Sequence, residues 1–158
     1  MESRFINYKK HKMEKSKNLS IVEHFKKVNI IKEEEKKKNK YIIAIDFDGT
    51  IVENQYPKIG KLISGAKKYI NKLYEDGHTI IIWTCRYDDD KEDAKKFLEK
   101  NDINFHDINK NAKRVQKTFN PHPKIYADIY IDDRAITRLP EWKEIYELVN
   151  EWNPDTVL

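Results

Sequence analysis

The chain has 158 residues and a single cysteine, and charged residues make up 37% of it against 39% hydrophobic residues. A chain of this length buries roughly 70% of its unfolded surface, and the lone Cys85 excludes an internal disulfide framework and a paired-cysteine zinc site. The longest apolar runs, at 41–45 and 80–83, fall well short of the ~20 residues that cross a bilayer. The amino-terminal residues are rich in Lys and Glu and lack the apolar core of a secretory signal, so we expect a cytoplasmic protein that does not bind membranes.

The basic residues are concentrated before residue 41. Residues 1–40 hold 13 Lys and Arg against 6 Asp and Glu, whereas residues 41–158 hold 18 against 21. The composition therefore predicts a basic extension at 1–40 and one mildly acidic domain at 41–158. The overall charge of +4 says little about what the domain binds.

Within the extension, residues 1–18 are polar and lysine-rich, which predicts disorder. An amphipathic helix is expected from Ser20, because Ser20 and Glu23 have the spacing of a capping box. The apolar residues of that helix recur with helical spacing: Ile21, Phe25, Val28 and Ile31. The extension is either an arm for nucleic acid or a protein partner, or a solubilising tail whose helix packs on the domain or on a second subunit. Interleaved glutamates and the lack of an aromatic array favour the tail.

From residue 41 onward, strand-like and helix-like segments alternate. Apolar runs at 41–45 and 79–83 predict two strands buried on both faces. A helix from Ser64 to about Glu75, closed by Gly77, is expected between them. The elements that follow are a helix opened by Asp88–Asp90, a weak strand at 103–105, a short helix at 111–118, a strand within 125–131, and a helix from Pro140 to about Glu151. This alternation predicts an α/β fold with a mostly parallel sheet.

Side chains capable of chemistry follow the apolar runs directly. They are Asp46 and Asp48 after the first strand, Thr84 after the second, and Asp132 and Asp133 after the last. Open α/β sheets bind ligands beyond the carboxyl ends of their strands, where these residues would meet. Because alternate residues of an extended chain project to the same side, the first two carboxylates face the same way. Several carboxylates at one sheet edge form an oxygen-rich site suited to Mg²⁺.

Three further residues bear on that chemistry. Thr84 offers a hydroxyl and a backbone N–H, and Lys124 offers a cation, so together they could hold a phosphate and leave a carboxylate as nucleophile. Cys85 has no histidine near it in the sequence, and we interpret it as a small buried hydrophobic residue rather than a nucleophile.

Four segments of the chain resemble, in order, the four motifs of the haloacid dehalogenase-like (HAD) superfamily. They are DFDGT at 46–50, IIIWTCR at 80–86 with its threonine, Lys124, and IYIDDRA at 129–135. The resemblance spans about 41–151, and YPKIG at 56–60 and KIYADIYIDDRA at 124–135 look like small phosphatase-like members that lack a cap domain. It implies a three-layer Rossmann-like fold and a Mg²⁺-dependent phosphomonoester hydrolase that acts through an aspartyl-phosphate.

The resemblance implies a role for each residue that matches a motif. Asp46 would attack phosphorus, and Asp48 would protonate the leaving oxygen and then activate the hydrolytic water. Thr84 and Lys124 would bind the transferring phosphoryl group, and Lys124 would also steady the nucleophile.

The resemblance also implies the metal ligands. Mg²⁺ would be held by Asp46, the backbone carbonyl of Asp48, and Asp132, while Asp133 would be a further ligand or would support one. Superfamily members that lack the second aspartate of the first motif are often not phosphatases, so the presence of Asp48 favours phosphoryl transfer.

The intervals between the motifs are too short for a sizeable cap domain. Only 37 residues separate Asp46 from Thr84, and 39 separate Thr84 from Lys124. An uncapped site must be covered by a large substrate, by a second subunit, or by the flap, which we define as residues 51–62.

Several residues are candidates for substrate contact. In the flap these are Tyr56, Pro57 and Lys58, although Tyr56 could equally be a packing residue. Arg86 and Arg134 follow motif residues closely and could each bind a substrate anion, with a surface ion pair as the alternative.

The sequence leaves the substrate and the oligomeric state open. The substrate is either a small metabolite or nucleotide, or the phosphorylated end of a nucleic acid. A different class of function is a receiver-like binding module whose aspartate accepts a phosphoryl group without turnover. Asp48 argues against that module, because a receiver needs no positioned acid or base, and steady-state phosphate release would distinguish the two.

Overall fold

The structure is a computed structural model that describes residues 39–119 and 123–153. The chain divides into two units, Met1–Asn39 and Lys40–Leu158, and this division falls where the sequence predicts the basic extension to end. The amphipathic helix predicted from Ser20 lies outside the described residues.

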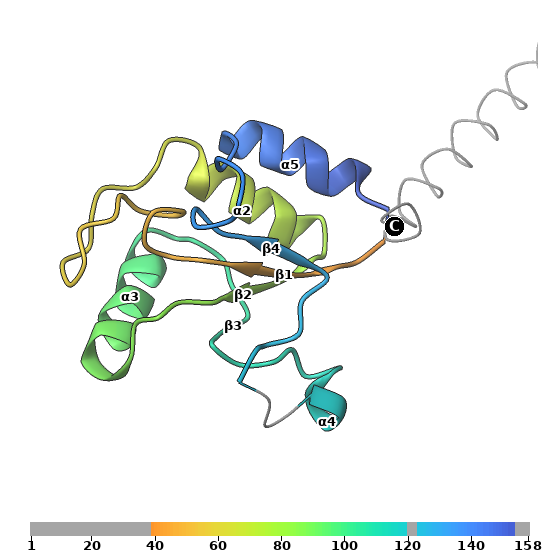
Figure 1. Cartoon of the computed structure of the whole chain (residues 1–158), viewed down its shortest axis with the longest axis horizontal. Helices are drawn as coiled ribbons and strands as arrows, with labels where there is room; N and C mark the ends of the chain where they lie inside the picture. The colour runs from red at the N-terminus through yellow and green to blue at the C-terminus, as the bar shows by residue number, and fades with distance from the viewer. Residues whose placement is uncertain (1–38, 120–122, 154–158) are drawn as a thin grey trace, which may run out of the picture. The chain divides into compact units, whose positions relative to one another are not determined.

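Short strands and helices alternate along this unit. The strands are β1 (Ile42–Ile45), β2 (Thr79–Ile82), β3 (Asp107–Ile108) and β4 (Ile129–Ile131), and the helices are α2 (Ala66–Glu75), α3 (Asp88–Lys100), α4 (Gln116–Phe119) and α5 (Trp142–Glu151). The strands form one sheet in the order β3-β2-β1-β4, and every pairing is parallel (Figure 1). The predicted α/β fold with a parallel sheet is therefore confirmed.

Both faces of the sheet are covered, which gives three layers. On one face, alternate residues of β1 and β2 share a buried cluster with the apolar side chains of α2, α3 and α5. On the other face, Ile42, Ala44 and Ile81 pack with Ala112 and Ile125, which flank α4. Figure 1 shows α2 and α5 together on one side of the sheet and α4 on the other. Burial on both faces explains why the β1 and β2 sequences are continuous apolar runs.

The predicted strand at 103–105 is wrong, because β3 begins four residues later. Ile103 is buried, but it packs in the turn that ends α3, where its N–H donates to the carbonyl of Leu98 at 3.0 Å. The apolar signal at this position therefore comes from closure of the helix rather than from a strand.

Two helices begin later than the sequence predicts. Helix α2 is preceded by Gly65 with a φ of 84°, and no side chain caps it, so Ser64 is not its N-cap. Helix α5 begins at Trp142 rather than at Pro140, and Glu141 precedes it in an extended conformation. Helix α4 is also shorter than expected, at four residues. The acidic first turn of α3 agrees with the prediction.

The first and last parts of the domain meet at the amino end of β1. The hydroxyl of Tyr41 donates to the backbone carbonyl of Trp152 at 2.8 Å, and the two rings lie edge to face with centroids 4.8 Å apart. Tyr41 also stacks on His78, whose Nδ1 accepts the Tyr41 backbone N–H at 3.2 Å. These contacts lie at the end of the sheet opposite to the carboxyl ends of the strands.

The flap leaves the sheet directly after β1 and returns before α2. Its two ends are held together, because the N–H of Glu53 donates to the carbonyl of Lys61 at 2.8 Å, and Val52 bridges to Leu62. Between β1 and β4 the described residues form only the flap, α2, β2, α3, β3, α4 and their connections, so they hold no large cap domain. Within the described part of the chain, every helix is too short or too polar to span a membrane.

Candidate functional site

Three carboxylates converge at the carboxyl ends of β1 and β4. Asp46 follows β1, and Asp132 and Asp133 follow β4; an oxygen from each lies within 4.8 Å of one from the others. The strands are adjacent, and the N–H of Asp46 donates to the carbonyl of Ile131 at 2.9 Å, which fixes the register of the two ends. The prediction that these acids gather at one sheet edge is confirmed. The side chain of Asp48 lies outside this cluster.

The glycine and threonine of DFDGT position Asp133. A Cβ on Gly49 would lie 2.3 Å from Oδ2 of Asp133, so only glycine permits this approach, and its φ of 95° also suits glycine. The hydroxyl of Thr50 accepts the backbone N–H of Asp133 at 3.0 Å. Trp142 then anchors the loop, because its indole N–H donates to the carbonyl of Thr50 at 3.1 Å.

The cluster carries uncompensated negative charge. Burial, together with repulsion from the carboxylates of Asp132 and Asp133, raises the pKa of Asp46 from 3.8 to about 7. Oδ1 of Asp133 is buried without a hydrogen-bond partner. An unpaired buried carboxylate oxygen within an all-oxygen donor set fits a hard divalent cation such as Mg²⁺, so the residues present suit the metal that the sequence predicts.

Asp48, in contrast, is fully paired. Both of its carboxylate oxygens accept from Arg86, from Nε and from one terminal nitrogen, each at 2.7 Å. The hydrogen bond that Arg86 donates to Asp48 raises the pKa of Arg86 above its ordinary value. Arg86 also donates to the carbonyls of Pro57 and Lys58 in the flap, each at 2.9 Å. Arg86 lines the pocket described below, where the sequence predicts a substrate contact, and its ion pair is buried rather than at the surface.

Thr84 follows the end of β2, as predicted, but its backbone N–H and carbonyl are already hydrogen-bonded within the protein. Its backbone N–H donates to Oδ1 of Asn109 at 2.8 Å, and Nδ2 of Asn109 donates back to its carbonyl at 2.7 Å. The hydroxyl accepts the backbone N–H of Arg86 at 3.2 Å, and Thr84 is one of the residues that line the pocket described below. The prediction that the Thr84 backbone N–H binds phosphate is therefore wrong. Asn109 follows β3 directly, so the strand-end rule would have found it if β3 had been placed correctly.

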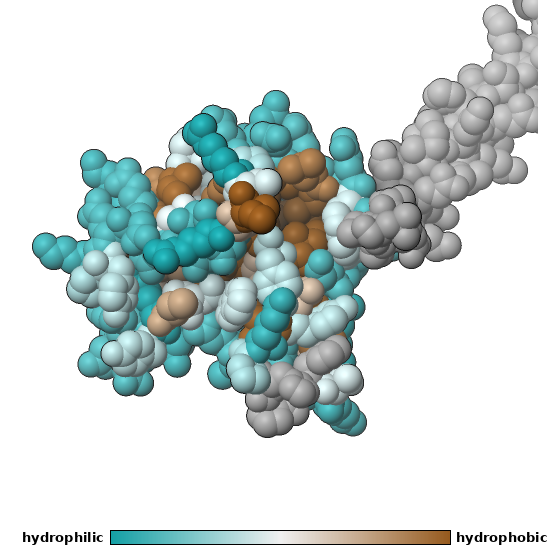
Figure 2. Space-filling view, viewed as in Figure 1, coloured by the Kyte–Doolittle hydropathy of each residue, from teal (hydrophilic) through white to brown (hydrophobic). Residues whose placement is uncertain are grey.

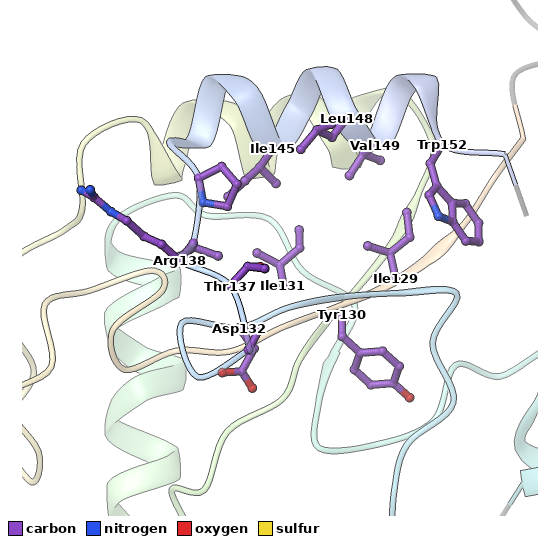
Figure 3. A pocket seen from close by; sticks show the side chains of 13 residues that line it. Ile129, Tyr130, Ile131, Asp132, Thr137, Arg138, Ile145, Leu148, Val149 and Trp152 are labelled. Atoms are coloured by element: carbon purple, nitrogen blue, oxygen red, sulfur yellow. The ribbon is translucent and has the colours of Figure 1, made fainter. Parts of the chain in front are cut away.

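Lys124 lies away from the carboxylates. Its Nζ is 4.7 Å from the centre of the Tyr130 ring, and it does not line the pocket that contains Asp46. Tyr130 projects from β4 on the side away from α5 (Figure 3). A cation over an aromatic face is stabilised electrostatically, and that contact holds Lys124 here. Its predicted contact with Asp46 is absent among the described residues.

A pocket of about 380 Å³ lies over the site. Asp46, Asp48 and Asp132 line it from the strand ends, and Thr84 lines its wall. The predicted substrate contacts Tyr56 and Arg134 also line the pocket, and both are exposed. The Tyr56 hydroxyl donates to Asp90 at 3.0 Å, which raises the pKa of Tyr56.

Two residues line this pocket that the sequence analysis did not place there. Asn54 comes from the flap, and Cys85 follows Thr84. Cys85 is exposed, which corrects its interpretation as a buried hydrophobic residue. It lies beyond the end of β2, where the chain has already left the buried sheet.

A second, apolar cavity of about 190 Å³ lies between β4 and α5. Ile129, Val149 and Trp152 line it, as Figure 3 shows, and Leu148 at its rim is exposed. Hydrophobic surface is visible beside α5 in the space-filling view (Figure 2). Asp132 borders both cavities, and Thr137 and Arg138 are further polar residues in the lining of this one.

Comparison with known proteins adds a relative. No family model matches the chain, and no curated protein matches it. A solved structure described as a conserved protein coded by a locus of Bacteroides thetaiotaomicron is 35% identical, with a TM-score of 0.66, and the match covers 72% of this chain and 92% of that one. The chain belongs to the same family as that protein. This family relationship agrees with the fold described above.

Proposed function

We propose that the chain is a Mg²⁺-dependent phosphomonoester hydrolase of the HAD type, with Asp46 as its nucleophile. The observation that carries the proposal is the convergence of Asp46, Asp132 and Asp133 at one sheet edge, where Asp46 and Asp132 line a pocket together with Thr84. These residues come from three motifs of the resemblance and meet at the sheet edge where α/β folds bind ligands.

The acidic residues would divide the chemistry between them. Asp46 would attack phosphorus and form an aspartyl-phosphate, which water then cleaves to restore the carboxylate. Asp132 and Asp133 would hold Mg²⁺ together with Asp46. When bound, the cation supplies the positive charge that lets a carboxylate approach an anionic phosphoryl group.

The pocket wall would bind the phosphoryl oxygens. Thr84 lines the pocket, and the exposed Arg134 borders it. We assign Arg134 the cationic role that the resemblance gave to Lys124, since Lys124 lies over Tyr130. Arg134 is also close to the metal ligands, because its backbone N–H donates to Oδ1 of Asp132 at 2.8 Å.

A screen of phosphate release from the full-length chain tests the proposal. The substrates are sugar phosphates, nucleotides, phosphoserine peptides, oligonucleotides with 3′- or 5′-phosphates, p-nitrophenyl phosphate and acetyl phosphate. We expect activity that disappears with EDTA and returns with Mg²⁺, because the site holds only hard oxygen ligands. Absence of release from every substrate in Mg²⁺, or full release by the metal-stripped chain, would contradict the proposal.

The alternative is a module that accepts a phosphoryl group on Asp46 and keeps it. One observation favours it: both oxygens of Asp48 accept hydrogen bonds from Arg86, so the residue expected to activate water is held in an ion pair. Release of many phosphates per chain supports the hydrolase, whereas a single equivalent retained as protein-bound phosphate supports the module.

A further inference from the structure

Tyr56 is a large aromatic side chain that the flap contributes to the lining of the pocket. It is 52% exposed, and it lines the pocket together with Asp46 and Asp132. Aromatic side chains in ligand pockets typically contact the apolar or flat parts of a ligand. The hydrolysis proposed above gives this ring no role, because that chemistry uses the carboxylates and the residues that bind the phosphoryl oxygens.

Two contacts fix the Tyr56 ring. The guanidinium of Arg86 lies over the ring, with its central carbon 5.2 Å from the ring centre. That guanidinium is itself held, because the Arg86 side chain is 1% exposed and donates to both oxygens of Asp48 and to two flap carbonyls. The second contact is from the Tyr56 hydroxyl, which donates to Asp90 at 3.0 Å. A ring held in this way loses little conformational freedom when a ligand stacks on it.

The same two contacts decide which part of Tyr56 remains for a ligand. The hydroxyl is engaged by Asp90, and one face of the ring is covered by the Arg86 guanidinium. The exposed half of the side chain therefore includes the opposite face of the ring. A free aromatic face offers stacking to a flat, unsaturated group rather than a hydrogen bond.

The ring and the acidic cluster occupy different parts of the pocket lining. Tyr56 contacts Arg86 and Asp90, whereas Asp46 faces the other two carboxylates of the cluster. The pocket volume of about 380 Å³ falls in the range of about 300–1,000 Å³ that is usual for small-molecule sites, so more than a phosphoryl group fits. A substrate with its phosphoryl group at Asp46 and a ring stacked on Tyr56 needs a spacer between the two.

The charge near Tyr56 favours a ligand with one phosphate over a polyanion. Its partner Asp90 belongs to the acidic first turn of α3, and residues 88–93 hold five acids against Lys91. The flap itself holds two lysines against one glutamate, so acids are in excess around the ring. A nucleic-acid chain that extended past the ring would bring further phosphates towards these acids, which repel them.

On the basis of the phosphohydrolase function proposed above, we propose that Tyr56 is a substrate-binding residue that selects nucleoside monophosphates. The phosphoryl group would lie at Asp46, the sugar would be the spacer, and the base would stack on the free face of Tyr56. Stacking of a base on an aromatic side chain is typically worth about 5- to 150-fold in affinity. Because every base has a π face, the selection is for the presence of a base rather than for one particular base.

The test compares AMP with ribose 5-phosphate, which present the same ester to the acidic cluster and differ in whether the sugar carries a base. It uses the full-length chain with Mg²⁺ and measures kcat/KM from phosphate release. We expect AMP to be favoured by at least about fivefold, the low end of base stacking. CMP should also be favoured over ribose 5-phosphate, and an oligonucleotide with a 5′-phosphate should be used less well than AMP. Better use of the oligonucleotide would overturn the substrate class.

Variants show whether the Tyr56 ring causes this preference. Tyr56→Leu should bring the ratio of kcat/KM for AMP to that for ribose 5-phosphate close to one, whereas Tyr56→Phe keeps the ring and should keep most of the preference. The control is Tyr87→Leu, since Tyr87 is exposed beside Arg86 in the sequence but does not line the pocket. A ratio measured on one preparation is independent of the folded fraction. A ratio that falls as far in Tyr56→Phe as in Tyr56→Leu would assign the preference to the hydroxyl and overturn the proposal.

Binding to Asp46→Asn separates failure of this inference from failure of the hydrolase. This variant lacks the nucleophile, so calorimetry in Mg²⁺ can measure the Kd of AMP and of ribose 5-phosphate without turnover. The proposal expects AMP to bind at least about fivefold more tightly. If phosphate is released but the two compounds are used and bound equally, the inference is overturned and the phosphohydrolase function stands. If no substrate releases phosphate, the phosphohydrolase function fails, and tighter binding of AMP would still support the Tyr56 surface while equal binding would overturn it.

Discussion

Asp46 and Asp48 lie two residues apart in one motif, yet their surroundings are opposite. Asp46 faces two further carboxylates, and burial raises its pKa to about 7. Asp48 has both oxygens bound by Arg86, a residue 38 positions along the chain. Two acids of the same type therefore acquire different chemistry from the partners that the fold supplies, one suited to a metal and a nucleophilic role, and the other to a fixed ion pair.

Replacement of Asp46, the acid that has no ion-pair partner among the described residues, should have the largest effect on turnover. Asp46→Asn should lower turnover at least ~10³-fold, because the amide cannot serve as the covalent nucleophile. The matched control is Asp93→Asn, which removes an exposed carboxylate on α3 that pairs only weakly with Lys96 at 3.4 Å. Phosphate release by both variants is the measurement, and near-normal turnover by Asp46→Asn with Mg²⁺ present would contradict the mechanism.

Replacement of Arg86, the ion-pair partner of Asp48, should mainly lower the stability of the fold. Arg86→Met should lower the free energy of unfolding by about 3 kcal/mol, because it leaves a mostly buried carboxylate without its partner. Arg114→Met removes an arginine whose side chain is 55% exposed, and should cost less than about 1 kcal/mol. Urea unfolding of the two variants measures this difference. Equal losses would show that the Asp48 pair contributes no more than a surface pair.

Titration of Asp46 should make Mg²⁺ binding depend on pH. Since the pKa of Asp46 is raised to about 7 from 3.8, this group favours the folded metal-free chain most below about pH 4, and that contribution is lost as pH rises through about 7. Mg²⁺ requires the ionised carboxylate, so protons compete with it below about pH 7. The Mg²⁺ concentration needed for half-maximal thermal stabilisation should therefore rise up to about tenfold per pH unit below 7. Asp46→Asn should abolish this pH dependence, and a dependence that survives in it would assign the titration elsewhere.

The smallest effect is expected at Lys124, which tests whether Asp46 has a cationic side chain as a partner. Since Lys124 contacts the Tyr130 ring, Lys124→Met should cost about 0.5–1 kcal/mol of stability and change kcat/KM by less than about fivefold. Lys113→Met, at another exposed lysine near α4, is the control. A loss approaching that of Asp46→Asn would show that Lys124 reaches the nucleophile during turnover.

The convergence of the carboxylates was predictable because it depends on position alone. Parallel strands end at a common edge, so the residues that directly follow apolar runs must meet there, and Asp46, Asp132 and Asp133 do. The same rule placed Thr84. For these residues, the local pattern of strand and turn carries the information.

The partners of these residues could not be predicted in the same way. Arg86 reaches the carbonyls of Pro57 and Lys58 only because the flap folds back over the end of β2, and no local pattern encodes this path or the pairing of Arg86 with Asp48. Asn109 was missed because Ile103 imitates a strand residue while closing α3. In each case, the identity of a neighbour depends on the path of a connecting segment through space.

The contact between Tyr41 and Trp152 has a consequence for engineering of the domain. It brings the beginning of β1 and the end of α5 together at the amino end of the sheet, away from the pocket. A short linker could therefore join these ends, with new termini opened at an exposed site such as Asn104, between α3 and β3. In such a circular permutant, every strand would keep its neighbours and the acidic edge would stay intact, while the order of the motifs along the chain would change.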